Sequence, residues 1–171
     1  PLSKAKGNMY EWVTHTHSHL GGECPHRCSY CYVQAIEKRF GRGRYAGKLR
    51  LIEKELGVRY GTGKVIFIEH CNDLFAEDVP REWIEKILGH CCQFPDNEYV
   101  FQTKNPERME RHAAAMPTKS ILGCTIETDL PMPDISKAPP AGNRIAAMER
   151  LAETQTTFIT VEPVINCRPC I

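Results

Sequence analysis

Three cysteines in one short loop constrain this chain more than any other feature. Cys24, Cys28 and Cys31 follow the pair Gly21-Gly22, with three residues in the first gap and two in the second. Three thiolates in one tight loop cannot all pair with one another, and they are soft ligands that favour iron–sulfur clusters, zinc or Cu(I). A [4Fe–4S] cube normally takes four cysteines. A loop that supplies only three leaves one iron with an open position, where chemistry can take place.

Two plainer interpretations compete with the cluster. A zinc knuckle needs a fourth ligand, and the nearby histidines that can offer one are His15, His17, His19 and His26. The first three alternate, so in an extended segment they point to the same side and either bind a metal or line the mouth of a cavity. Structural zinc loops more often use two pairs of cysteines, however, and no second pair is nearby. Three unrelated buried cysteines rarely gather behind two glycines.

The sequence resembles a known family in five stretches, of which the cysteine loop is the first. They are residues 20–33 around the cysteines, Phe101-Gln102-Thr103-Lys104-Asn105-Pro106, residues 122–128, Ser136-Lys137-Ala138-Pro139-Pro140 and Thr160-Val161-Glu162-Pro163. The first resembles the cluster loop of radical S-adenosylmethionine (SAM) enzymes. All five together are similar to a phage- and archaea-associated radical SAM family that is catalogued largely without an assigned substrate.

The length and amino-acid composition are those of an ordinary globular chain in a reducing compartment. The 171 residues, 42% hydrophobic and 25% charged, predict one domain over 1–171. Nine cysteines, an odd number, argue against a secreted disulfide scaffold and favour the cytoplasm. No apolar run approaches the roughly 18–20 residues of a membrane span. The net charge is +1, but one stretch without acidic residues contains Lys38, Arg39, Arg42, Arg44, Lys48 and Arg50. It either grips phosphates of a nucleic acid or is simply solvated.

Strand and helix patterns alternate along the chain. Apolar runs predict strands at 9–16, 65–68, 99–101, 121–126 and 158–161, and helical spacing predicts helices near 33–40, 46–56, 83–91, 106–115 and 145–151. This alternation predicts a parallel α/β sheet with right-handed crossovers. The resemblance implies a partial (β/α) barrel of about five to six parallel strands, the radical SAM core. Because the sequence stops just after the fifth strand, the barrel is either unusually short or truncated.

Functional residues of parallel β/α folds gather at the carboxyl ends of the strands. After the predicted strands, the polar segments are the cluster loop, residues 69–73, residues 102–105, residues 127–129 and residues 162–166. Five polar strand ends on one edge, beside a cysteine loop, predict a site there.

The resemblance implies a mechanism and roles for these residues. Cys24, Cys28 and Cys31 hold a [4Fe–4S] cluster whose free iron binds SAM, and one electron cleaves SAM to a 5′-deoxyadenosyl radical that abstracts hydrogen from substrate. Tyr30 stands where the family's backbone meets the adenine. Asn72 or Asp73 accepts from the SAM amino group, Lys104 pairs with its carboxylate, and Gln102 and Thr103 hydrogen-bond to it. Glu127 binds the ribose, and Glu162 lines the adenine pocket or ends the strand. For Lys104 and Glu127 a surface ion pair is the alternative.

Three other cysteines lie near the predicted site, namely Cys71, Cys167 and Cys170. They either bind an auxiliary cluster or include a thiol that donates a hydrogen atom, for which Cys71 is the catalytic candidate. A radical SAM enzyme also needs an electron donor such as a flavodoxin or ferredoxin. The basic stretch and the phage association of similar proteins indicate a nucleic acid or a nucleotide as its substrate. The rival functions are a zinc-bound domain that recognises nucleic acid and an iron–sulfur electron carrier.

Overall fold

The computed structural model describes residues 2–7, 9–41, 43–130 and 133–165. Its strands are β1 (Ser3–Lys4), β2 (His15–His17), β3 (Leu20–Gly21), β4 (Arg50–Leu51), β5 (Val65–Ile68), β6 (Glu98–Thr103), β7 (Ser120–Thr125) and β8 (Thr156–Thr160). Its α-helices are α1 (Tyr32–Phe40), α2 (Arg81–Cys92), α3 (Pro106–Glu110) and α4 (Ala141–Ala152), with 3₁₀ helices η1 (Glu53–Gly57) and η2 (Ala113–Ala115).

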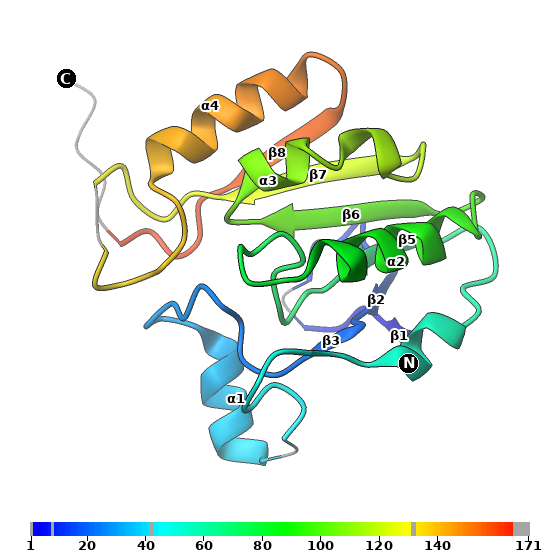
Figure 1. Ribbon diagram of the computed structural model, residues 1–171, viewed down its shortest axis with the longest axis horizontal. Coiled ribbons are helices and arrows are strands. Elements are labelled where there is room, and N and C mark those ends of the chain that lie inside the picture. Colours follow the sequence, from blue (N-terminus) through cyan, green and yellow to red (C-terminus); the bar gives the residue numbers. More distant parts are fainter. Residues whose placement is uncertain (1, 8, 42, 131–132, 166–171) are drawn as a thin grey trace.

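Six strands form the main sheet in the order β1-β2-β5-β6-β7-β8 (Figure 1). The five strands from β2 to β8 run parallel, whereas the short β1 pairs with β2 in the antiparallel direction. This sheet confirms the predicted α/β class and a partial β/α core, with one antiparallel edge strand that no sequence pattern indicated. β3 and β4 form a separate two-stranded sheet.

The two faces of the main sheet bury different residues. On one face, Ile66, Phe101 and Leu122 pack with apolar residues of α2, α3 and α4 in the larger core, and Figure 1 shows these three helices along the sheet. The opposite face carries Phe67 and Val100. Alternate residues of a strand point to opposite faces, so the central strands β5 and β6 carry continuous apolar runs, Val65–Ile68 and residues 99–101.

The second face is closed by aromatic side chains at its centre. Tyr10 stacks on Trp12 at 5.3 Å between ring centroids and meets Phe158 edge-on at 5.5 Å. A Cβ atom at Gly123 would lie 2.3 Å from the Phe158 ring, so β7 has glycine there to admit that ring.

Two predicted elements are wrong in detail. The first strand is expected over 9–16 but covers only His15–His17, because Tyr10 and Trp12 belong to a turn whose rings pack on the sheet. The helix expected over 46–56 is absent: that segment holds β4 and η1. Gly43 and Gly47 adopt positive φ angles, and the Arg50 side chain donates to four backbone carbonyls, of residues 43, 44, 46 and 48, which favours a compact loop over a helix.

The other helices and strands follow the predicted pattern. The helix predicted near 106–115 is split into α3 and η2. α1 ends at Gly41, whose φ of 50° is the left-handed conformation expected of a C-terminal glycine. No helix among the described residues is long and apolar enough to cross a bilayer.

Candidate active site at the cysteine loop

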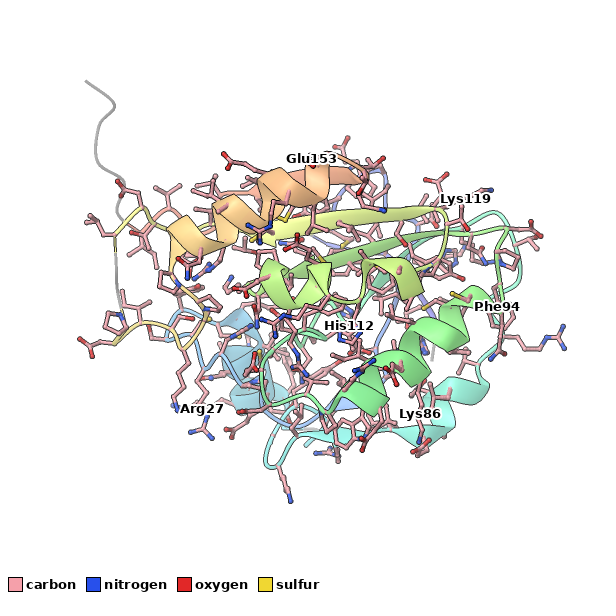
Figure 2. The ribbon with its side chains drawn as sticks, turned by 45° about the horizontal axis from the view of Figure 1, so that its top comes forward. Arg27, Lys86, Phe94, His112, Lys119 and Glu153 are labelled. Carbon is pink, nitrogen blue, oxygen red and sulfur yellow. The ribbon has the colours of Figure 1, made fainter. Side chains whose placement is uncertain are left out.

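The cysteine loop lies at the carboxyl ends of the parallel strands. Figure 2 shows Arg27, in the middle of this loop, at the opposite end of the molecule from Lys119, which precedes β7. Gly22, which precedes the cysteine loop, lets the segment from Arg44 to Lys48 approach its backbone closely. Gly22 donates from its backbone to the Arg44 carbonyl at 2.8 Å, and a Cβ atom there would lie 2.3 Å from the Lys48 carbonyl oxygen. Gly22 also has a φ of 85°, which only glycine adopts readily.

The three cysteines of the loop are free and close together. Cys28 is buried, and Cys24 and Cys31 are half-buried. Burial raises the pKa of the Cys24 thiol to about 12, and the negative charges of Asp73, Cys28 and Cys31 add to this effect. A metal cation bound at these sulfurs would reverse this effect and lower the pKa of the Cys24 thiol, because a coordinating thiol is deprotonated.

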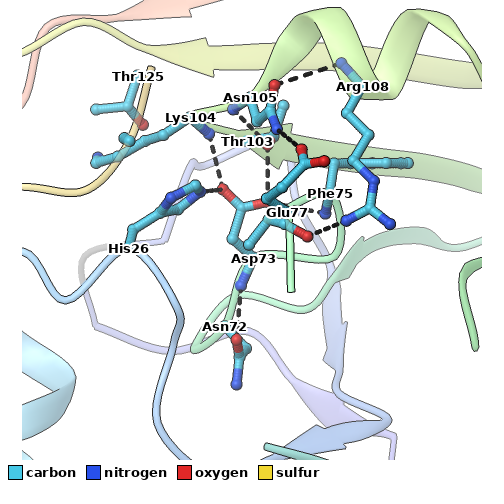
Figure 3. Close-up of polar contacts among 12 residues, drawn as sticks. His26, Asn72, Asp73, Phe75, Glu77, Thr103, Lys104, Asn105, Arg108 and Thr125 are labelled. Atoms are coloured by element: carbon cyan, nitrogen blue, oxygen red, sulfur yellow. Dashed lines mark hydrogen bonds and ion pairs between the residues drawn. The ribbon is translucent and has the colours of Figure 1, made fainter. Parts of the chain in front are cut away.

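Asp73 ties the cysteine loop to the sheet (Figure 3). Its Oδ2 atom lies 2.8 Å from Nε2 of His26, which sits between two of the cysteines, and accepts from the Lys104 backbone N–H at 2.8 Å. Its Oδ1 atom accepts from the Thr103 hydroxyl at 2.7 Å and from the Phe75 N–H at 2.9 Å. Burial alone would raise the pKa of Asp73, but these partners outweigh it and lower the pKa.

This network changes the role expected for three residues. A carboxylate accepts about four hydrogen bonds, and Asp73 already has four. Thr103 is also committed, because its hydroxyl donates to Asp73 and accepts from the Asn105 N–H. Asn72 uses its side-chain oxygen on the Asp73 N–H and donates from its amide to the Gly22 carbonyl at 3.2 Å. These side chains build the frame around the loop, and only the Asn72 amide keeps a hydrogen to offer.

Lys104, Tyr30 and Glu127 converge beside Cys28. The Lys104 ammonium lies 5.5 Å from the centroid of the Tyr30 ring. The Tyr30 hydroxyl is buried and faces Cys28 and Glu127, and its pKa is raised first by burial and then by these two groups. It makes no hydrogen bond of acceptable geometry with any described residue. A buried hydroxyl without a partner is costly, so this spot suits a bound group.

Glu127 is held by Arg144, a residue that the sequence analysis missed. Arg144 donates to both carboxylate oxygens, at 2.6 and 3.2 Å, and to the carbonyls of Thr125 and Pro139. Both side chains are buried, so the surface ion pair considered for Glu127 is instead an internal one. The signal was present in the sequence: Arg144 falls on the apolar face of α4, with Ala141, Met148 and Leu151.

The Arg144–Glu127 pair also forms one wall of a cavity of about 420 Å³ under the loop that precedes α4. Burial alone would raise the pKa of Glu127, but the hydrogen bonds from Arg144 and the charges of Lys104 and Arg144 lower it.

The remaining predicted cofactor contacts lie at the same edge of the sheet. Gln102 donates to the Thr125 hydroxyl at 2.8 Å and accepts from the Tyr10 hydroxyl at 2.9 Å, so it lines the face opposite the helices. Glu162 follows β8 and is exposed.

Cys71 lies near the cysteine loop, in contact with two tyrosine hydroxyls. Burial raises its pKa, whereas hydrogen bonds to Tyr45 and Tyr32 lower it, with a net upward shift. Cys167 and Cys170, expected as its partners in an auxiliary cluster, lie outside the described residues.

The alternating histidines do not line a cavity as the sequence suggested. His17 and His19 are buried. His19 contacts the Glu69 carboxylate at 3.0 Å through Nδ1, and its Nε2 lies 3.0 Å from Nδ1 of His90. In the described part of the chain, no three of His, Cys, Asp and Glu are placed to hold a single metal ion. A [4Fe–4S] cube binds its three cysteines through three different irons, so it does not need three ligands that converge on a single ion.

The chain has the fold of solved structures of spore photoproduct lyase. One is a double mutant with bound AdoMet and dinucleoside spore photoproduct, at a TM-score of 0.64 and 15% identity, with 92% of this chain and 48% of that chain covered. Another is a complex with dinucleoside spore photoproduct, at a TM-score of 0.65 and 15% identity, with 94% and 48% covered. The chain thus spans about half the length of those proteins.

A search of curated proteins finds no match. A family model described as "Protein of unknown function (DUF5131)" matches residues 8–168, which is nearly the whole chain, so this protein belongs to the DUF5131 family.

Proposed function

We propose that this protein is a radical SAM enzyme that acts on a nucleic-acid-related substrate. One observation supports this best: three free, mutually close cysteines lie at the carboxyl edge of a parallel sheet, in a fold that carries bound AdoMet in spore photoproduct lyase. The unpartnered Tyr30 hydroxyl beside Cys28 adds that a bound group fits there. All seven described cysteines are free, which suits the reducing cytoplasm.

The bound groups supply the difficult chemistry, and the protein supplies their placement. Cys24, Cys28 and Cys31 would hold a [4Fe–4S] cluster. Reduced by a flavodoxin- or ferredoxin-type donor, the cluster would pass one electron to SAM and cleave its S–C5′ bond, which gives methionine and a 5′-deoxyadenosyl radical. Lys104 pairs with the SAM carboxylate, because its ammonium points to the space above Tyr30. Gln102 and the free amide hydrogen of Asn72 contribute hydrogen bonds.

Two other expected contacts are assigned differently. Glu127 acts through its ion pair with Arg144, which aligns the carboxylate toward Tyr30 and leaves little of it for a ribose. Glu162 stays a candidate for the adenine pocket because it follows β8 at the same edge of the sheet.

Cys71 is the candidate hydrogen-atom donor. Its pKa is raised, chiefly by burial, so the thiol keeps its hydrogen at neutral pH, and a protonated thiol is the form that can donate a hydrogen atom. The Cys71→Ala variant should still bind the cluster and still cleave SAM. Cluster loss in this variant would instead place Cys71 among the ligands.

An exposed surface on α1, which begins directly after Cys31, supports the proposed substrate class. Tyr32, Ile36 and Phe40 recur every four residues along this helix and are 56%, 49% and 63% exposed. The Arg39 guanidinium lies 5.3 Å from the Phe40 ring centroid on the same surface. Exposed rings with adjacent cations are typical of surfaces on which single-stranded nucleic acids stack their bases.

The first experiment is electron paramagnetic resonance of anaerobically reconstituted, dithionite-reduced protein, with and without SAM. A [4Fe–4S]⁺ signal that changes with SAM is expected, and Cys28→Ala should abolish it. Cys92→Ala is the matched control, because Cys92 is exposed and lies on α2, away from the loop. A cluster signal that ignores SAM would indicate an electron carrier, and bound zinc without iron would refute the proposal.

The substrate class is tested separately by fluorescence anisotropy with a labelled single-stranded oligonucleotide. Binding should weaken with salt, because phosphate contacts release counterions, and Arg39→Ala should weaken it at every salt concentration. Lys119→Ala, at the far end of the molecule (Figure 2), is the control. Equal binding by both variants would remove α1 from the substrate surface.

A further inference from the structure

The loop that precedes α4 lies across the cysteine loop and is fixed there by backbone hydrogen bonds. The Ser29 N–H donates to the Ile135 carbonyl at 2.8 Å, and the Lys137 N–H donates to the His26 carbonyl at 2.8 Å. These two bonds stand on either side of Ser136. The position of Ser136 relative to the cysteines is therefore set by the backbones of both loops.

The Ser136 side chain contacts one of the cysteines. Its Oγ atom lies 3.1 Å from Sγ of Cys28, and both residues are buried. Its Oγ atom also accepts from the Ala138 backbone N–H at 3.1 Å. The direction of the bond to sulfur depends on the state of Cys28. A metal-bound thiolate carries no hydrogen and can only accept, so the Ser136 hydroxyl donates to it while the same oxygen accepts from Ala138.

We propose that Ser136 is a positioning residue that donates a hydrogen bond to the Cys28 thiolate and thereby raises the reduction potential of the cluster. The inference deepens the proposed function and rests on it. Reduction adds one negative charge to the cluster and its ligands, and a donor aimed at a ligand sulfur stabilises the more negative state. Burial strengthens the effect, because water does not screen the bond.

The loop that carries Ser136 is also connected to the Glu127 carboxylate. Ser136 belongs to the loop that is followed by Arg144, whose side chain holds the Pro139 carbonyl and Glu127 together. The same loop therefore connects the ligand sulfur of Cys28 with the Glu127 carboxylate that faces Tyr30. Any displacement of this loop would loosen the hydrogen bond to sulfur.

The test is the midpoint potential of the cluster, measured by a redox titration followed by electron paramagnetic resonance. Ser136→Ala should lower the potential while the iron content stays that of the unaltered protein. Ser136→Thr keeps the hydroxyl and should restore most of the potential. Ser29→Ala is the control: Ser29 is an exposed residue of the cysteine loop, and its backbone hydrogen bond to Ile135 survives the substitution.

The outcomes separate this inference from the proposed function. A full cluster with an unchanged potential in Ser136→Ala overturns the role of Ser136 and leaves the radical SAM proposal standing. Absence of any cluster in the unaltered protein overturns both. If Ser136→Ala fails to retain iron, the unaltered protein in D₂O decides by pulsed electron–nuclear double resonance. An exchangeable deuteron coupled to the cluster in the unaltered protein and in Ser136→Thr supports the inference, and its absence from the unaltered protein refutes it.

Discussion

Removing the Arg144 side chain should destabilise the protein far more than removing a neighbouring surface arginine. Arg144→Ala leaves the Glu127 carboxylate buried without its partner and removes the donors of the Thr125 and Pro139 carbonyls. Breaking a buried ion pair from one side costs about 3–5 kcal/mol, a large part of the roughly 5–15 kcal/mol that stabilises a typical domain. Urea unfolding at pH 7 measures this loss. Arg150→Ala, on the exposed face of α4 beside Glu110, should change the free energy of unfolding very little.

The pH dependence supplies a sharper test of the same pair. In the unaltered protein the pKa of Glu127 is lowered from its usual 4.5, so its contribution is present above that pH and is lost as the pH falls through the folded value. In Arg144→Ala the carboxyl group keeps its burial, which raises the pKa, and loses its strongest partner, so that only Lys104 and the Tyr30 hydroxyl still lower the pKa. Burial should then raise its pKa, and the variant should lose stability as the pH rises above about 4.5.

The double variant Glu127→Gln/Arg144→Met tests the same pair without leaving a buried charge. It removes both charges, so its stability should exceed that of Arg144→Ala, as expected when a buried charge no longer lacks a partner. The reasoning is refuted if Arg144→Ala costs no more than Arg150→Ala, or if its stability rises with pH through the same range as that of the unaltered protein.

Three further predictions concern other parts of the structure. Gly123→Ala should lower the free energy of unfolding in urea by about 1–3 kcal/mol, because its Cβ would meet the Phe158 ring at 2.3 Å. Gly142→Ala, with open space around its Cβ, should not lower it, and equal effects of the two substitutions would contradict the packing argument. Asp73→Asn should lower the iron retained after reconstitution, because an amide cannot accept all four of the hydrogen bonds that fix the cysteine loop, and full iron content would refute this role. Lys104→Met should weaken SAM binding in equilibrium dialysis without loss of iron, and an unchanged affinity would remove Lys104 from the SAM site.

Local patterns predicted most of the sheet and its helices because those elements are apolar in a regular way. The apolar runs inside β5, β6 and β7 are continuous, as expected of strands buried on both faces, whereas the edge strand β8 is partly exposed. In the segment 46–56 the apolar spacing predicts a helix, but Gly43, Gly47 and the carbonyl contacts of Arg50 favour a loop. Periodicity does not register a side chain that competes for backbone carbonyls.

The candidate site was only partly visible before the structure. Spacing alone singled out Cys24, Cys28 and Cys31, because a ligand motif within eight residues is local. The parallel-strand rule then collected Asp73, Thr103 and Glu127 as polar residues at one edge, and the structure does bring them to that edge. The parallel-strand rule does not tell which of these polar atoms already have a hydrogen-bond partner within the protein. Asp73 and Glu127 looked like ligand contacts until their partners, His26 and Arg144, came into view.

The sequence by itself determined the parallel α/β architecture and the three-cysteine loop, because apolar periodicity and short motifs act over a few residues. Only the tertiary structure decided how the strand ends are used. Ser136 meets Cys28 across 108 positions of the chain, and Arg144 reaches Glu127 from the next helix. A hydrogen bond between distant segments depends on how the sheet and its loops pack, and packing is a property of the whole chain that no local pattern encodes.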